Sequence, residues 1–126
     1  MKRATLILFS IILLFALVGC KINGVGALEQ AGDLQFVLPN QESFPVPKDS
    51  TLWTWVASWL QETQAGWISS PASYVPGYVL KGKDFNLNLN EGFAVLNFKD
   101  SKGKYHQFFK ELTPSEFVAF KQAAGI

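Results

Sequence analysis

The stretch FNLNLN at residues 85–90 restricts the fold more than any other feature, because apolar and polar side chains alternate in it without exception. Such alternation is typical of a β-strand that has one face against a core. Turn signals containing glycine precede and follow the stretch, so this strand is predicted to pair with its neighbours on both sides. One face then carries Phe85, Leu87 and Leu89, and the other carries Asn86, Asn88 and Asn90.

Further strands are predicted around this one. Residues 78–81 follow a proline–glycine turn signal, residues 93–100 are apolar on both faces, and residues 104–112 return after a hairpin turn. Residues 33–38 are a candidate first strand, whereas residues 40–48 contain two prolines and are predicted to be an extended loop. The sequence therefore predicts an antiparallel β-meander of three to five strands.

A tryptophan-rich helix is predicted before the meander, over residues 49–63, with Asp49 or Ser50 as its N-cap. Apolar residues recur there at helical spacing. The centre of the apolar stripe holds Val56 and Trp59, and its edges hold Trp53 and Trp55. Stripes of this kind usually pack inward. The alternative is that Trp53 or Trp55 is partly exposed and anchors a partner protein or stacks on a sugar.

A second helix is predicted after the meander. Thr113 and Glu116 have the spacing of a capping box, with a proline at the first helical position, and Gly125 is the expected helix end. Phe117 and Phe120 share one face of this helix. The predicted fold class is α+β, a small single domain in which the meander packs with an N-terminal tryptophan-rich helix and a C-terminal helix.

The N-terminus has the layout of a secretory signal. Two positive charges, Lys2 and Arg3, precede an apolar run over residues 4–19. That run is shorter than the roughly 20 residues that a spanning helix needs, although an N-terminal anchor helix is the alternative.

The only cysteine of the chain, Cys20, directly follows the apolar run. The sequence Leu17-Val18-Gly19-Cys20 resembles the lipobox of bacterial lipoproteins. The resemblance implies that a signal peptidase cuts before Cys20 and that this residue carries a diacylglycerol thioether and an acyl chain. Two or three chains give stable membrane anchoring, whereas one gives only marginal binding. The alternative is a buried free thiol. No other cofactor is expected.

The same resemblance predicts the organisation and location of the chain. Residues 1–19 are the expected signal peptide, residues 20–32 the lipidated cysteine with a flexible tether, and residues 33–126 the globular domain. Residue 21 is lysine rather than the aspartate that commonly retains lipoproteins on the inner membrane. We therefore expect an anchor in the outer membrane facing the periplasm, or in the outer face of the plasma membrane for a Gram-positive source.

Composition excludes several function classes for residues 20–126. Without Lys2 and Arg3, nine of the 11 basic residues remain against 10 acidic ones, and all nine are lysines. Nucleic-acid binding favours a basic patch and arginine, so no nucleic-acid partner is expected. The single cysteine allows no intramolecular disulfide, and stability must come from burial of apolar and aromatic side chains.

Catalytic chemistry has little support in the sequence. His106 is the one histidine, no motif supplies a nucleophile or an orienting acid for it, and no cluster has the spacing of metal ligands. The asparagine row is either a solvent-facing surface or a platform whose amides bind a glycan or a partner's backbone. The favoured function is a non-catalytic lipoprotein that binds an envelope or secretion protein, or a toxin or hydrolase that it neutralises as an immunity lipoprotein does. The alternatives are a lipoprotein that binds peptidoglycan glycan and a small envelope hydrolase.

Overall fold

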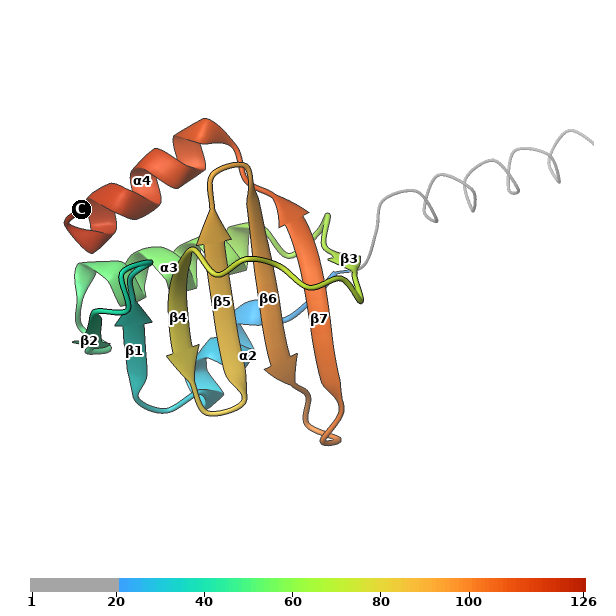
Figure 1. Cartoon of the computed structure of the whole chain (residues 1–126). Helices are drawn as coiled ribbons and strands as arrows, with labels where there is room; N and C mark the ends of the chain where they lie inside the picture. The colour runs from blue at the N-terminus through green and yellow to red at the C-terminus, as the bar shows by residue number, and fades with distance from the viewer. Residues whose placement is uncertain (1–20) are drawn as a thin grey trace, which may run out of the picture.

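The computed structural model describes residues 21–126 (Figure 1). The expected lipobox residues Leu17, Val18, Gly19 and Cys20 lie outside the described residues. The described part is an α+β domain built on one antiparallel sheet, which confirms the predicted fold class. The sheet has seven strands in the order β2-β1-β4-β5-β6-β7-β3, so the predicted number of three to five was too small.

The central strands are β4 (Tyr78–Gly82), β5 (Phe85–Asn90), β6 (Phe93–Lys99) and β7 (Tyr105–Glu111). They form the predicted meander, because the turns between them are short and each strand pairs with the next. Strand β1 (Leu34–Val37) pairs with β4, and the sheet ends in β2 (Ser43–Val46) on one side and β3 (Ile68–Ser69) on the other.

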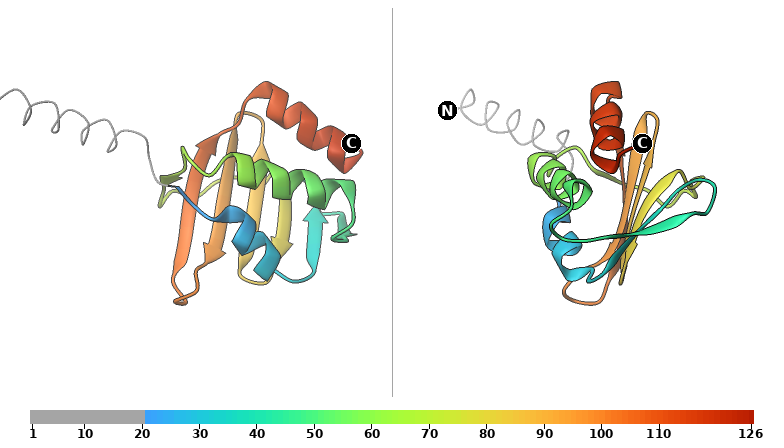
Figure 2. Two further views of the ribbon diagram at one scale, coloured as in Figure 1. Left: turned by 180° about the vertical axis from the view of Figure 1, so that it is seen from behind. Right: turned by 90° about the vertical axis from the view of Figure 1, so that its left-hand side faces the viewer.

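Three helices cover one face of the sheet in the described part of the chain (Figure 2). They are α2 (Gly24–Gln30), α3 (Thr51–Glu62) and α4 (Pro114–Ala124). The core lies between these helices and the apolar side of the sheet, where Leu87 of β5, Leu96 of β6 and Phe120 of α4 are fully buried. The two predicted faces of β5 are therefore confirmed: its leucines point into the core, and its asparagines lie on the opposite face.

The two predicted helices have the expected ends. Ser50 caps α3, since its hydroxyl accepts a hydrogen bond from the backbone N–H of Trp53, and Val56 and Trp59 face the core. Thr113 and Glu116 form the predicted capping box at the start of α4, and Gly125 ends the helix in the left-handed conformation with φ 74°. Both boundaries follow from local side-chain to backbone bonding.

The flexible tether predicted for residues 20–32 is wrong for the part that the structure describes. Residues Gly24–Gln30 form α2, and Leu28 and Ala31 are each only 1% exposed. Small residues allow this packing: a Cβ added at Gly24 would lie 2.9 Å from Cδ2 of Leu60 in α3. The absence of a side chain at Gly24 therefore lets α2 approach α3 closely, and Ile22 is already part of the core.

The loop predicted for residues 40–48 is also corrected, because it contains strand β2. Proline cannot donate to a sheet ladder and is therefore confined largely to edge strands. Pro45 lies in β2, which is an edge strand, so its missing N–H leaves the pairing with β1 in place. The two-residue strand β3 at the opposite edge was not predicted either, because two residues carry no readable alternation.

Candidate functional site

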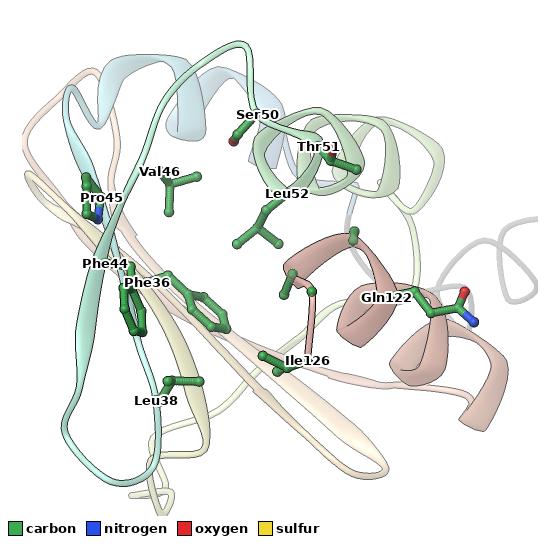
Figure 3. Close-up of a pocket in the computed structure, with 13 residues that line it drawn as sticks. Phe36, Leu38, Phe44, Pro45, Val46, Ser50, Thr51, Leu52, Gln122 and Ile126 are labelled. Carbon is green, nitrogen blue, oxygen red and sulfur yellow. The ribbon is translucent and has the colours of Figure 1, made fainter.

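An apolar groove with a volume of about 630 Å³ opens at the β2 edge of the sheet (Figure 3). The β1–β2 hairpin, the first turn of α3 and the end of α4 enclose it. Figure 3 shows Phe36, Leu52 and Ile126 reaching into the same space from β1, from α3 and from beyond α4. We call this feature the hairpin groove; its main apolar lining residues are Phe36, Leu38, Phe44, Val46, Leu52 and Ile126.

The β1–β2 hairpin supplies both the floor and the rim of the hairpin groove. Phe36 and Phe44 are paired across the two strands, yet Phe36 is 4% exposed and Phe44 is 49% exposed. Phe36 is held by the core, because its ring packs against Tyr78 and Phe120. Phe44 has no such neighbour across the strand edge and remains open to solvent, as does Ile126 with 48% of its surface exposed.

One polar side chain of the hairpin groove, Ser50, is already engaged in hydrogen bonds within the chain. The Ser50 hydroxyl donates to the carbonyl of Pro47 at 2.6 Å and accepts from the N–H of Trp53 at 3.2 Å. Apart from Ser50, Thr51 and Gln122, the lining side chains are apolar. The hairpin groove is therefore suited to receiving apolar groups and offers no titratable side chain for catalysis.

The hairpin groove has no direct signature in the sequence, because residues 36–52 build it together with the distant residues 122–126. The available signal was Phe44, a large aromatic side chain between prolines in a segment predicted to be a solvated loop. An aromatic residue in such a place is a candidate contact residue, and its exposure in the structure is consistent with that interpretation.

The predicted tryptophans Trp53 and Trp55 are both half-buried and pack against the core. Trp55 stacks on Trp59 with ring centroids 5.8 Å apart and also contacts Phe120. Among the described residues, the indole N–H of Trp53 has no hydrogen-bond partner. Both side chains thus contribute to the helix layer, and a role for either in binding a partner stays a prediction.

Trp59 links α3 to α4 by donating its indole N–H to the carboxylate of Glu116. The same carboxylate accepts from the backbone N–H of Thr113 at 3.0 Å. Partial burial opposes ionisation of Glu116, but the hydrogen bonds from Trp59 and Thr113 outweigh it and lower the pKa of Glu116 from its ordinary value. Glu116 is therefore ionised, and its carboxylate joins α3 to the start of α4 through these hydrogen bonds.

The predicted asparagine platform binds backbone, but the backbone belongs to the same chain. Residues 70–77, which we call the strap, cross the polar face of the sheet in front of strands β4 to β7 (Figure 1). Asn88 accepts from the N–H of Gly77 at 2.8 Å and donates to the carbonyl of Val75 at 3.1 Å. Asn90 donates to Asn88 and weakly to Val75. Asn88 is only 7% exposed, so the solvent-facing alternative is wrong for this residue, and a role for it in binding a partner stays a prediction.

The strap lies close enough for these bonds because Gly77 has no side chain. A Cβ at Gly77 would lie 2.7 Å from the carbonyl oxygen of Leu89. Farther along, Gln107 of β7 donates to the carbonyls of Ser70 and Ala72, each at 2.7 Å. Asn86 is half-buried, and it differs from its two neighbours in the row because its side chain makes no hydrogen bond to any described residue.

His106 is paired with Asp100 at 2.8 Å between Nε2 and Oδ2. The hydrogen bond from His106 and those from the backbone N–H groups of Lys104 and Lys102 lower the pKa of Asp100 to about 2. The imidazole also stacks on Phe108 with ring centroids 5.7 Å apart. These contacts give His106 a structural role at the β6–β7 turn.

Residues 21–126 hold no group of three or more His, Cys, Asp or Glu side chains arranged to bind a metal ion. Among the same residues, no helix combines the length and the apolar character needed to cross a membrane. Comparisons of the chain with protein-family models, curated proteins and solved structures found no match.

Proposed function

We propose that this chain is a non-catalytic lipoprotein, anchored by lipid chains on Cys20 in the outer membrane facing the periplasm, that binds a protein partner. The observation that carries the binding proposal is the hairpin groove, an open apolar concavity of about 630 Å³ with Phe44 and Ile126 exposed at its rim. Exposed apolar concavities of this kind mark interaction sites on soluble domains.

The occupant that fits the hairpin groove is an apolar side-chain cluster of the partner. Strand β2 borders the groove with a free edge, but Pro45 has no N–H to offer there, which disfavours addition of a partner strand. Most of the lining is apolar and the Ser50 hydroxyl is bonded within the chain, so the groove favours an apolar group over a polar one. The partner is an envelope or secretion component, or a toxin or hydrolase that this lipoprotein neutralises.

In-cell crosslinking of the full chain with a pull-down from the envelope tests this proposal. Phe44→Asp places a charge at the groove rim, and because Phe44 is 49% exposed the variant is expected to fold. Val118→Asp is the matched control, since Val118 is 54% exposed on α4 and does not line the groove. A Cys20→Ser variant tests whether the anchor is required.

The proposal predicts one protein recovered in stoichiometric amount with the wild type and with Val118→Asp, and at least about tenfold less with Phe44→Asp. Recovery of the partner should also be lost with Cys20→Ser if the two proteins bind only at the membrane. Recovery of no protein, equal recovery with Phe44→Asp, or recovery of phospholipid in place of protein would contradict the proposal.

A further inference from the structure

A second cavity, of about 380 Å³, lies on the opposite face of the sheet from the helices and is closed on one side by the strap. We call it the amide cavity. Two neighbouring rows of the sheet form its floor: Val79, Asn88 and Val95 are paired across three strands, and Asn86, Asn97 and Gln107 are paired across the next row. Tyr74 and Pro76 of the strap form its wall.

The amide cavity contains a free pair of amides. Asn86 and Asn97 are directly opposite each other on β5 and β6, both are half-buried, and neither side chain hydrogen-bonds to another described residue. Asn88 and Gln107 beside them are engaged with the strap backbone. Each free amide offers two donors and one acceptor, so the pair can satisfy groups that both donate and accept.

The remaining lining restricts the ligand further. All eight lining side chains are uncharged, which favours a neutral ligand over an ion. Val79, Val95 and Pro76 supply apolar surface, and Tyr74 supplies an aromatic ring that is already stacked on Phe109 at a centroid distance of 5.7 Å. A compact molecule with polar edges and C–H faces matches this combination.

A sugar ring combines polar edges with C–H faces. The cavity volume of about 380 Å³ lies in the range of about 300–1,000 Å³ that is typical of small-ligand pockets. An extended peptide fits less well, because the strap already occupies the amides that bind backbone. We propose that the amide cavity binds an N-acetylated sugar, whose acetamido group pairs with the Asn86 and Asn97 amides. The cell wall as its source rests on the proposed envelope location, whereas the binding chemistry does not.

Side-chain amide NMR of the full chain in detergent tests this inference, with the trimer of N-acetylglucosamine as the probe. The expected result is a saturable shift of the Asn86 and Asn97 side-chain N–H signals at millimolar or lower concentration. Asn86→Ala and Asn97→Ala should each weaken binding about tenfold, since each removes the hydrogen bonds of one amide. A glucose trimer, which lacks acetamido groups, should bind at least about tenfold more weakly.

The design separates this inference from the proposed protein binding. Phe44→Asp lies in the hairpin groove and should leave the sugar-induced shifts unchanged, while Asn86→Ala should leave protein recovery in the crosslinking experiment unchanged. Absence of saturable shifts with the N-acetylglucosamine trimer overturns the inference. Equal binding of the glucose trimer, or shifts that persist in both alanine variants, also overturns it.

Discussion

Replacing Asn88 with alanine should loosen the strap and destabilise the domain. The side chain is 7% exposed and makes three hydrogen bonds, with the N–H of Gly77, the carbonyl of Val75 and the amide of Asn90. Two of these partners are backbone groups of the strap: the N–H of Gly77 loses its side-chain acceptor, and the carbonyl of Val75 keeps only the bond from Asn90. The strap has no other hydrogen bond to β5 except the long one from Asn90 at 3.4 Å.

The magnitude follows from those bonds. A net hydrogen bond contributes about 1 kcal/mol, and a buried group left without a partner costs about 1–3 kcal/mol. Gly77 is half-buried, so water replaces part of the lost bonding there. We therefore expect Asn88→Ala to lower the free energy of unfolding by about 2–3 kcal/mol. Asn86→Ala is the matched control on the same strand and face, and because the Asn86 side chain makes no hydrogen bond to any described residue its effect should stay within about 0.5 kcal/mol.

Urea unfolding of both variants gives the free energies, and amide hydrogen exchange of Gly77 reports the strap itself. The expected result is a lower urea midpoint and faster Gly77 exchange in Asn88→Ala, with neither change in Asn86→Ala. Equal urea midpoints for the two variants, together with unchanged Gly77 exchange, would refute the conclusion that the asparagine row supports the strap.

Leu28, Thr113 and the pair formed by Asp100 and His106 provide further tests. Leu28→Ala should lower the free energy of unfolding by about 2–5 kcal/mol in urea titrations, because Leu28 is 1% exposed in the core, whereas a flexible tether predicts no effect. Thr113→Ala should lower the free energy of unfolding by about 1 kcal/mol, because it removes the capping box. An unchanged urea midpoint would contradict this prediction. The ionised form of Asp100 is favoured in the folded state, so its contribution to stability is present above pH 3.8 and is lost as the pH falls towards 2. His106→Ala should raise the pKa of Asp100 towards 3.8 in a carbon-13 NMR titration. A midpoint still at about 2 would show that His106 is not the main cause of the lowered pKa.

The meander and the helix ends were predictable because their signals are local. Alternation in residues 85–90 and the turn residues around them placed β5 and its neighbours, and the capping residues Ser50 and Thr113 placed the helix starts. Each of these features depends on side chains within a few positions of one another, so the sequence carries them directly.

The errors arose where tertiary context decides. A segment rich in small residues, as α2 is, is typical of a tether, but here the absence of a side chain at Gly24 lets the helix backbone approach Leu60. Pro45 suggested a loop, and only its place at a sheet edge makes a strand acceptable. The asparagine row signalled a polar face correctly, but nothing in residues 85–90 shows that residues 70–77 cover it.

The candidate sites were the least predictable part for the same reason. The hairpin groove combines the β1–β2 hairpin, α3 and α4, and the amide cavity combines four strands with the strap. Periodicity identifies which face a residue occupies, but it does not identify which distant segment lies next to that face. The exposure of Phe44, and the absence of a hydrogen bond from the Asn86 side chain to any described residue, are visible only in the assembled sheet.

We propose that the mature protein is a lipoprotein beginning at Cys20, and mass spectrometry of the membrane-extracted protein tests this proposal. We expect a mature N-terminal peptide that starts at Cys20, lacks residues 1–19, and carries the mass of diacylglycerol with or without an additional acyl chain. In Cys20→Ser the lipid mass should disappear and the protein should leave the membrane fraction. Recovery of an intact N-terminus with an unmodified Cys20 would contradict the account.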